Sequence, residues 1–289
     1  MARGPGRHEP VHDAIIAAAR TGEPDRYLAA LLAPRAQRAD LLALAAFAAE
    51  LARVATAARR EPAMAEIRWQ WWREALARPL GAEATGHPVA DHVRALMARH
   101  GIAAAAVCRL VDAHACDLER LPFADDAALD RHFVASEGAL FQLSGRILGL
   151  PANGYAPDWS DWAGRAYGMG RLLFGLEPQL ARGRCPIPRT RLAAAGLDFG
   201  AIAGERGSAG FVALLADLGR QARANLEQAR RHATKLPREA SIAVLPLALV
   251  GPYVRASERA RGASPQRVAD VAPLTRVMRI AGAHWFGRW

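Results

Sequence analysis

The sequence has few of the residues that cross-link a fold. Its 289 residues include three cysteines, Cys108, Cys116 and Cys185, which cannot all pair, and a chain of this length does not need disulfides. We therefore expect free thiols and a reducing compartment. Cys108 and Cys116 lie eight residues apart on one face of an expected helix, where small core residues are a simpler interpretation than a metal or redox site.

Signals for β-structure are equally scarce. The chain has no sustained alternation of apolar and polar residues, and no Asn-Gly turn between Val/Ile-rich runs. It is rich in alanine, leucine and arginine, which favour helices. We predict an all-α protein: a disordered N-terminus over residues 1–10, a single-domain helical bundle over residues 11–273, and a basic aromatic C-terminal tail over residues 274–289.

Long hydrophobic runs are missing as well. The longest are Leu41 to Ala49 and Ile242 to Val250, the second including a proline. Each holds nine residues, which is too short to span a bilayer. The first ten residues carry charge but no apolar core of signal-peptide length. These features predict a cytoplasmic protein, either soluble or peripheral on the inner membrane.

Lysine is almost absent from a strongly basic chain. Lys235 is the only one, so arginine supplies 37 of the 38 basic residues behind a net charge of +10. Many arginines lie within a helical turn of an acid, as Arg53 does with Glu50, which favours a solvated basic surface. The alternative is a preference for anionic partners, either membrane headgroups or pyrophosphates. No long basic run or Cys/His finger spacing is present, so we expect no nucleic-acid partner.

Apolar residues gather in one stretch, from Asp40 to Leu76. Its first half predicts a helix that Asp40 could cap, with apolar residues at three- and four-residue intervals. A break near Pro62 precedes a second helix with Trp69, Trp71 and Trp72. The rings lie on both sides of this helix, so we expect burial between layers.

Proline and glycine divide the remainder of the chain into helices. They predict helices over residues 11–20, 25–33, 88–100, 103–120, 125–149, 159–182, 211–232 and 240–260, the last of them bent or begun at Pro246. Gly138 and Gly145 fall inside an apolar helix and indicate close approach by another helix or by a ligand.

Two polar features could be taken for metal sites, but simpler structural roles account for both. Asp125 and Asp126, followed by Asp130, stand where a helix begins, so their carboxylates can cap free amides and oppose the helix dipole. His114 lies on an apolar stripe, which indicates a hydrogen-bonded core histidine. We therefore expect no metal ligands among these residues.

Four segments, taken in order, resemble the squalene/phytoene synthase superfamily. They are Ala43 to Glu50, Glu66 to Leu76, Phe133 to Leu143 and Tyr167 to Pro188, and the likeness covers roughly residues 25–260. Members of that superfamily are single-domain bundles of helices around an apolar prenyl pocket. The resemblance implies the same fold here.

The resemblance also implies where catalytic groups would lie. Active members join two prenyl diphosphates head to head, and two Asp-rich segments hold the magnesium that grips the diphosphate. Alignment places Ala52, Arg53 and Thr56 at the first segment, and Gly175 and Gln179 at the second. We therefore expect no catalytic residues, no metal ligands and no cofactor.

A particular branch shares this pattern without aspartates. It contains the complex I assembly factor of squalene/phytoene synthase type and its bacterial relatives, and Glu50, Val54, Gln70, Trp71 and Trp72 fit its description. The resemblance implies a noncatalytic binding or assembly factor at a membrane surface. Its expected partners are respiratory complex I subunits or a prenyl lipid, with an anionic membrane surface as a further one.

The resemblance suggests which residues line a pocket or bind a ligand: Glu50, Arg53, Arg68, Trp72, Gly138, Gln142, Glu177, Gln179, Arg182 and Arg184.

Two alternatives stay open. The first is an active prenyltransferase of the phytoene or squalene synthase type, using Mg²⁺ and carboxylates from Asp112, Asp117, Glu119, Glu50 and Glu177. The second is a structural helical protein that shares only the arrangement. For the tail, Trp285 and Phe286 fit a membrane contact, and packing back on the bundle is the other interpretation.

Overall fold

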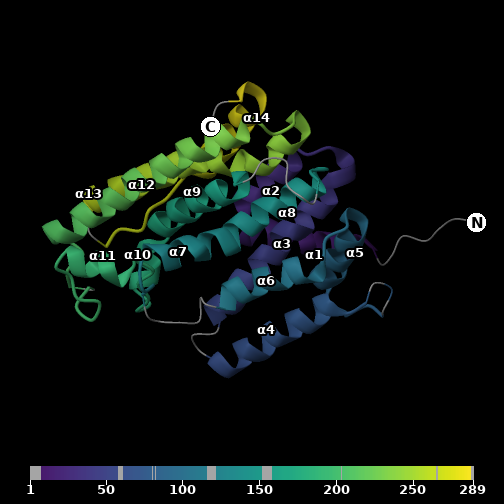
Figure 1. Ribbon diagram of the computed structural model, residues 1–289, viewed down its shortest axis with the longest axis horizontal. Helices are drawn as coiled ribbons and strands as arrows, with labels where there is room; N and C mark the ends of the chain where they lie inside the picture. Colours follow the sequence, from purple (N-terminus) through teal and green to yellow (C-terminus); the bar gives the residue numbers. More distant parts are fainter. Residues whose placement is uncertain are drawn as a thin grey trace, which may run out of the picture. The chain divides into compact units, whose positions relative to one another are not determined.

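The regular elements of the chain are helices. The computed structural model describes residues 8–57, 61–79, 81, 83–115, 122–151, 158–202, 204–264 and 266–287, and these residues contain no strand. Their contacts group into two units, one made of Met1–Leu118 with Gln142–Asn153 and the other of Glu119–Phe141 with Gly154–Trp289. The all-helical prediction is confirmed (Figure 1).

The first unit is built around one helix, α3. Its elements are α1 (His8–Gly22), α2 (Pro24–Leu31), α3 (Arg35–Ala57), α4 (Pro62–Ala77), α5 (Pro88–His100) and α6 (Ala104–Ala115). The other five all contact α3. Every residue of α3 from Asp40 to Ala49 is buried, as expected for a helix that is apolar nearly all round.

Helix α4 differs from its prediction. Trp69 and Trp72 are buried, and the Trp72 ring meets Phe47 of α3 edge-on at 5.0 Å between centroids. The opposite side faces solvent, where Ile67 is 60% exposed. The prediction of burial on both sides of this helix was wrong, because α3, α5 and α6 contact it from one side.

The second unit is built around α9. Its elements are α7 (Asp126–Phe133), η2 (Val134–Gly138), α9 (Trp159–Phe174), α10 (Leu176–Leu180), α11 (Arg189–Ala194), α12 (Ala209–Ala233), η3 (Arg238–Leu249), α13 (Val250–Ala263) and α14 (Pro273–Phe286). α9 contacts α7, η2, α10, α12, η3 and α13. α8 (Ala139–Ile147) follows η2 directly, and the boundary between the two units falls inside it, after Phe141.

Glycines let the neighbours of α9 approach closely. A Cβ added to Gly164 would lie 2.5 Å from the Gly138 nitrogen, and one added to Gly168 would lie 2.4 Å from the Phe133 ring. The prediction of close helix approach at Gly138 is confirmed. The contact falls where η2 forms one π-helical turn between α7 and α8, an irregularity that the predicted continuous helix over residues 125–149 missed.

One stretch of the second unit is long and apolar enough to cross a membrane. Arg238–Ala263, comprising η3 and α13, has a window of mean hydropathy 1.4, but 83% of that window is buried inside the protein. The 3₁₀ turns of η3 contain Pro246 and lead directly into α13, where the sequence predicted a bend. Such burial is typical of the core helix of a globular unit.

The C-terminal segment is a helix rather than an irregular tail. In α14, Ile280 and Ala283 are buried and the helix packs on η3, while Trp285 and Phe286 are exposed. Packing back on the bundle therefore accounts for one face of this segment. Arg288 and Trp289, like Cys116, Asp117 and Glu119, lie outside the described residues.

Candidate functional site

The last part of α3 carries Ala52, Arg53 and Thr56, the positions aligned with the family's first Asp-rich segment. We call this part the first station, and the positions aligned with the second Asp-rich segment the second station. Arg53 there donates to the carboxylate of Glu50, with Nε 3.1 Å from Oε2. Thr56 turns its hydroxyl back to the Ala52 carbonyl at 2.9 Å. The carboxylate of Glu50 is thus held by a guanidinium one turn away, and Ala52 has no polar side chain.

The second station lies where α9 ends and α10 begins. The Gly175 amide donates to the Arg171 carbonyl at 2.8 Å, closing α9, and Gln179 follows in α10. Glu177 is the acid at this station. Its side chain is buried, with Oε2 3.4 Å from Arg206 Nη1, and its Oε1 has no hydrogen-bond partner among the described residues.

Burial controls the protonation of Glu177. Loss of solvent raises the pKa of its carboxyl group, and the charges of Arg206 and Arg261 lower it by less. The surroundings of this acid are therefore cationic and poorly hydrated. A carboxylate already placed between guanidinium groups is a poor additional ligand for a divalent metal.

The residues at these stations do not fit a magnesium site. Magnesium takes oxygen ligands, chiefly carboxylates and phosphates, in near-octahedral geometry. The five aligned positions carry none of these carboxylates, and both nearby acids, Glu50 and Glu177, face arginine. Within the part of the chain that the structure describes, no group of three or more His, Cys, Asp or Glu side chains could hold a metal ion.

The other predicted pocket residues are dispersed over several elements. Trp72 is buried in α4 and Arg68 is half-buried on the same helix, whereas Gln142 of α8 is exposed. Arg182 is exposed and Arg184 half-buried in the turn after α10. Their roles as pocket residues stay a prediction.

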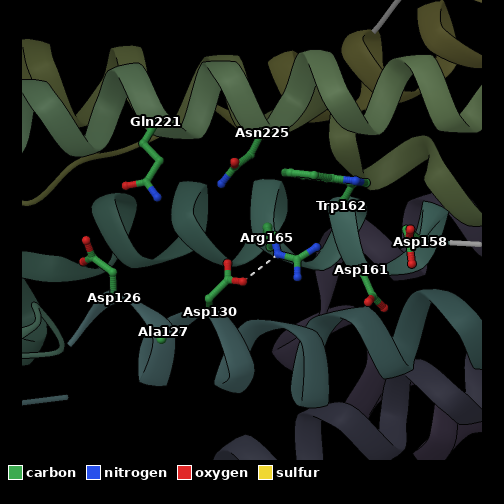
Figure 2. Close-up of a pocket in the computed structure, with 9 residues that line it drawn as sticks. All are labelled: Asp126, Ala127, Asp130, Asp158, Asp161, Trp162, Arg165, Gln221 and Asn225. Carbon is green, nitrogen blue, oxygen red and sulfur yellow. Dashed lines mark hydrogen bonds and ion pairs between the residues drawn. The ribbon is translucent and has the colours of Figure 1, made fainter. Parts of the chain in front are cut away.

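A pocket whose lining residues were not among the predicted pocket residues lies within the second unit. It has a volume of about 610 Å³ and is lined by side chains from α7, the start of α9, and α12: Asp126, Ala127, Asp130, Asp158, Asp161, Trp162, Arg165, Gln221 and Asn225. Figure 2 shows Gln221 and Asn225 of α12 pointing towards the helix of Trp162 and Arg165, with Asp130 of α7 beside Arg165.

The chemistry of this pocket is acidic and hydrogen-bonding. Arg165 Nε donates to Asp130 Oδ2 at 2.8 Å, and its guanidinium lies 4.8 Å from the centre of the Trp162 ring (Figure 2). Burial raises the pKa of Asp161, Arg165 lowers it, and the charges of Asp158 and Asp130 raise it further. Carboxylates and an indole face suit a cationic group far better than a diphosphate.

The sequence carried a partial signal for this pocket. Asp126 and Asp130 lie one helical turn apart, and Asp158 and Asp161 have the same relation at the start of α9. The role of the helix start was predicted correctly, because Asp125 caps α7 by accepting from the Ala128 amide at 2.8 Å. The sequence could not predict that α7, α9 and α12 lie next to one another and form a pocket.

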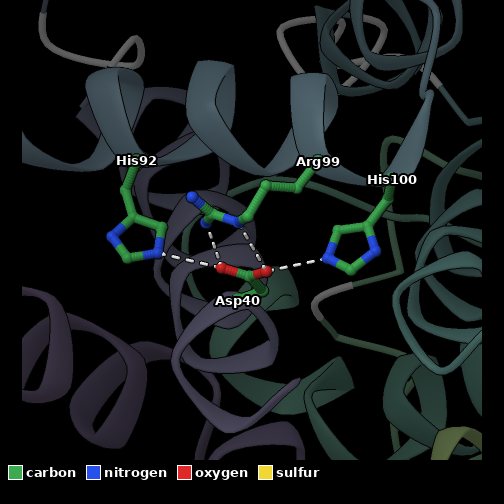
Figure 3. A network of polar contacts seen from close by, with 4 residues as sticks. All are labelled: Asp40, His92, Arg99 and His100. Atoms are coloured by element: carbon green, nitrogen blue, oxygen red, sulfur yellow. Dashed lines mark hydrogen bonds and ion pairs between the residues drawn. The ribbon is translucent and has the colours of Figure 1, made fainter. Parts of the chain in front are cut away.

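A second polar cluster lies in the first unit. Asp40 accepts from Arg99 and lies 3.2 Å from His92 Nε2 and 2.7 Å from His100 Nε2 (Figure 3). Burial alone would raise the pKa of Asp40, but these three partners hold it well below its usual range. α3 begins five residues earlier, at Arg35, so the prediction that Asp40 caps this helix was wrong. Asp40 instead ties α5 to α3.

The fold and these stations define the class of the protein: an all-helical chain of the isoprenoid synthase type. A family model described as squalene/phytoene synthase matches residues 19–275. The chain therefore belongs to the squalene/phytoene synthase family. No curated protein matches it.

Solved structures share this fold. Squalene synthase HpnC from Alicyclobacillus acidocaldarius is 19% identical with a TM-score of 0.72, over 86% of this chain and 94% of that one. A dehydrosqualene synthase crystallised with a ligand is 14% identical with a TM-score of 0.76, over 96% of each chain. YisP from Bacillus subtilis subsp. subtilis strain 168 is 14% identical with a TM-score of 0.69, over 94% of this chain and 96% of that one.

Proposed function

We propose that this chain is a binding protein built on the squalene/phytoene synthase fold and does not ionise prenyl diphosphates with magnesium. One observation carries the proposal. The positions aligned with the family's two Asp-rich segments hold Ala52, Arg53, Thr56, Gly175 and Gln179, which supply no carboxylate.

Electrostatics supports the proposal. Arg53 places a fixed positive charge at the first station, and its ion pair with Glu50 occupies the one acid close by among the described residues. Departure of a diphosphate requires compensation of its developing negative charge. Arginine can bind such a group, but it cannot bring the divalent charges that bound metal ions would add.

The partner that we propose is a component of respiratory complex I during its assembly, or a prenyl lipid. The resemblance to the assembly-factor branch motivates this choice through Glu50, Val54, Gln70, Trp71 and Trp72. The solved structures described above add no support for that branch, so the proposed partner depends on these residues alone.

An active head-to-head prenyltransferase is the second candidate. The names of two similar structures, a squalene synthase and a dehydrosqualene synthase, favour it, as does the family itself. Its acids would be Glu50, Asp112, Glu177, Asp117 and Glu119. Asp112 is held by Arg73, with Oδ1 2.6 Å from Nε, so this ligand set would need side chains that are now in ion pairs.

Turnover separates the two candidates. The purified chain is incubated with farnesyl or geranylgeranyl diphosphate and Mg²⁺, and pyrophosphate release and lipid products are measured. We expect no release above the protein-free control. Release that stops with a chelator would overturn the proposal, and loss of that release in Glu50→Gln or Glu177→Gln would identify the acid involved.

A genetic experiment tests the assembly role separately. Deletion of the gene is expected to lower the amount of assembled NADH dehydrogenase, and the intact gene is expected to restore it. Normal complex levels in the deletion strain would contradict this role. Normal levels would not bear on the proposal that the chain is noncatalytic, which the turnover measurement tests.

A further inference from the structure

Helix α14 has an apolar face that nothing in the described chain covers. Leu274, Met278, Trp285 and Phe286 are 70, 65, 69 and 74% exposed. The spacing of Leu274, Met278 and Trp285 places these three side chains on one side of the helix. Ile280 and Ala283 are buried on the opposite side, where the helix packs on η3. A surface helix normally turns its polar side outward, so this arrangement is unusual.

The apolar face is accompanied by a group of arginines. Arg279 of α14, Arg255 and Arg259 of α13, and Arg223 of α12 are all exposed. Arg255 lies close enough to the other three that their charges, after burial, lower its pKa. Glu258 opposes this effect with a single negative charge, and its carboxylate accepts from Arg223 at 2.8 Å. Four guanidinium groups beside this one carboxylate keep an excess of positive charge.

Local contacts hold α14 in this orientation. Arg276 donates to the Tyr253 hydroxyl, and its guanidinium lies 5.2 Å from the Tyr253 ring and 5.6 Å from the Phe174 ring. α14 is thus fixed to α13 and to the end of α9 by its inner side. These contacts fix which side of α14 faces outward, so the exposure of its apolar side does not result from fraying of the chain end.

We propose that the outer face of α14, with Arg223, Arg255, Arg259 and Arg279, is a docking surface for an anionic phospholipid membrane. Leu274, Met278 and Trp285 enter the boundary between headgroups and acyl chains, where indole rings are favoured. The guanidinium groups pair with lipid phosphates. The surface is independent of the function proposed above, since none of these residues belongs to either aligned station.

Charge decides between a membrane and a second copy of the chain. A symmetric dimer through this face would bring the arginines of one copy towards those of the other, which is unfavourable. An anionic bilayer offers opposite charge over an area of any size. Each arginine near such a surface strengthens binding by about fivefold at moderate ionic strength.

Vesicle flotation tests the proposal with the full chain. Vesicles of phosphatidylcholine alone are compared with vesicles containing about 30% phosphatidylglycerol, a composition that gives a strong negative surface potential. We expect flotation with the anionic vesicles only, and release at high salt. Failure of the intact chain to float with either type would overturn the proposal.

Three variants separate the contributions. Met278→Asp with Trp285→Ser should abolish flotation, and Arg255→Gln with Arg279→Gln should weaken binding by roughly 25-fold. Ile67→Asp is the matched control, because Ile67 is a 60% exposed apolar residue of α4, which contributes nothing to this surface, and it should bind as the intact chain does. Circular dichroism should show equal helix content in all of them. Flotation of the Met278/Trp285 variant equal to that of the intact chain would overturn the membrane assignment. So would a dimer of the intact chain that becomes monomeric in this variant.

Discussion

The pKa values of individual carboxyl groups in this chain differ because their neighbours differ. Asp40 is buried among three cationic or hydrogen-bonding groups, and its pKa is low. Asp161 is partly buried beside other acids, and burial and these acids raise its pKa above the ordinary value. The two residues should therefore respond to pH in opposite directions, which makes them a useful pair for mutation.

Replacement of Asp40 by asparagine should destabilise the chain. Charged hydrogen bonds of this kind contribute about 2 kcal/mol to the free energy of unfolding. Because the folded pKa is depressed, this stability is complete above the ordinary aspartate pKa near 4 and is lost as the pH falls below it. Urea unfolding of both proteins at pH 7 and at about pH 3 should show the difference shrinking in acid. A constant difference would contradict this account.

Asp161 should show the opposite sign. Its folded pKa is raised, so ionisation of this carboxyl group costs folding free energy at neutral pH. Asp161→Asn should unfold at an equal or higher urea concentration than the intact chain at pH 7. Asp198→Asn, at an acid outside this pocket, serves as the control and should have little effect. Marked destabilisation by Asp161→Asn would mean that the carboxylate makes a needed contact.

The two described thiols should be poor nucleophiles. Burial raises the pKa of Cys185 to about 11. For Cys108, burial and the charge of Asp112 raise the pKa, and its side chain is only half-buried. Iodoacetamide at about pH 7.5 should label Cys108 slowly and Cys185 only after denaturation, as mass spectrometry of the peptides would show. Rapid labelling of Cys185 in the folded chain would contradict its burial.

At the scale of elements, helix contacts in the second unit depend on missing side chains. Gly164→Ala would place a methyl group 2.5 Å from the backbone of Gly138, and backbone cannot move aside as a flexible side chain can. We expect a loss of about 1–3 kcal/mol of unfolding free energy. Gly262→Ala in α13 is the control, because nothing lies within 4 Å of its added Cβ, and it should stabilise by about 0.5 kcal/mol. Calorimetry or urea unfolding would measure both.

The elements that could be predicted from the sequence are those with local signals. α5 runs from Pro88 to His100 as predicted, since proline starts it and Gly101, at φ 58°, ends it. The Asp40 cluster could not be predicted, because His92 and His100 lie more than fifty residues away in sequence. The same limit applies to the pocket of α7, α9 and α12, and to the one-sided burial of α4. Local spacing gives a helix its faces, but only tertiary contacts show which face is covered.

At the scale of the whole molecule, a basic chain carries an acidic pocket and a cationic face on the same unit. The net charge of +10 predicted neither location, because arginines are spread along the sequence and become a group only when α12, α13 and α14 pack. The family and the all-helical fold were predicted from four ordered segments, and the match over residues 19–275 confirms them.

Binding of metal and pyrophosphate can be tested on the whole chain without turnover. A synthase whose folded state binds both ligands would be stabilised by them, and its Tm would rise with their concentration. We expect Mg²⁺ with pyrophosphate to leave the Tm of this chain unchanged. A concentration-dependent rise that requires both ligands, measured by scanning fluorimetry with Ca²⁺ as a comparison, would contradict the expectation.

The ion pair between Arg53 and Glu50 bears on any attempt to engineer catalysis into this scaffold. Replacement of Ala52, Arg53 and Thr56 by aspartate would remove the guanidinium group that now pairs with Glu50. Four acids would then lie within two turns of one helix. Such crowding of like charge would weaken the helix unless a cation arrived to relieve it. A redesigned chain should therefore be less stable without Mg²⁺ than with it, so that its stability would be coupled to the metal that its chemistry needs.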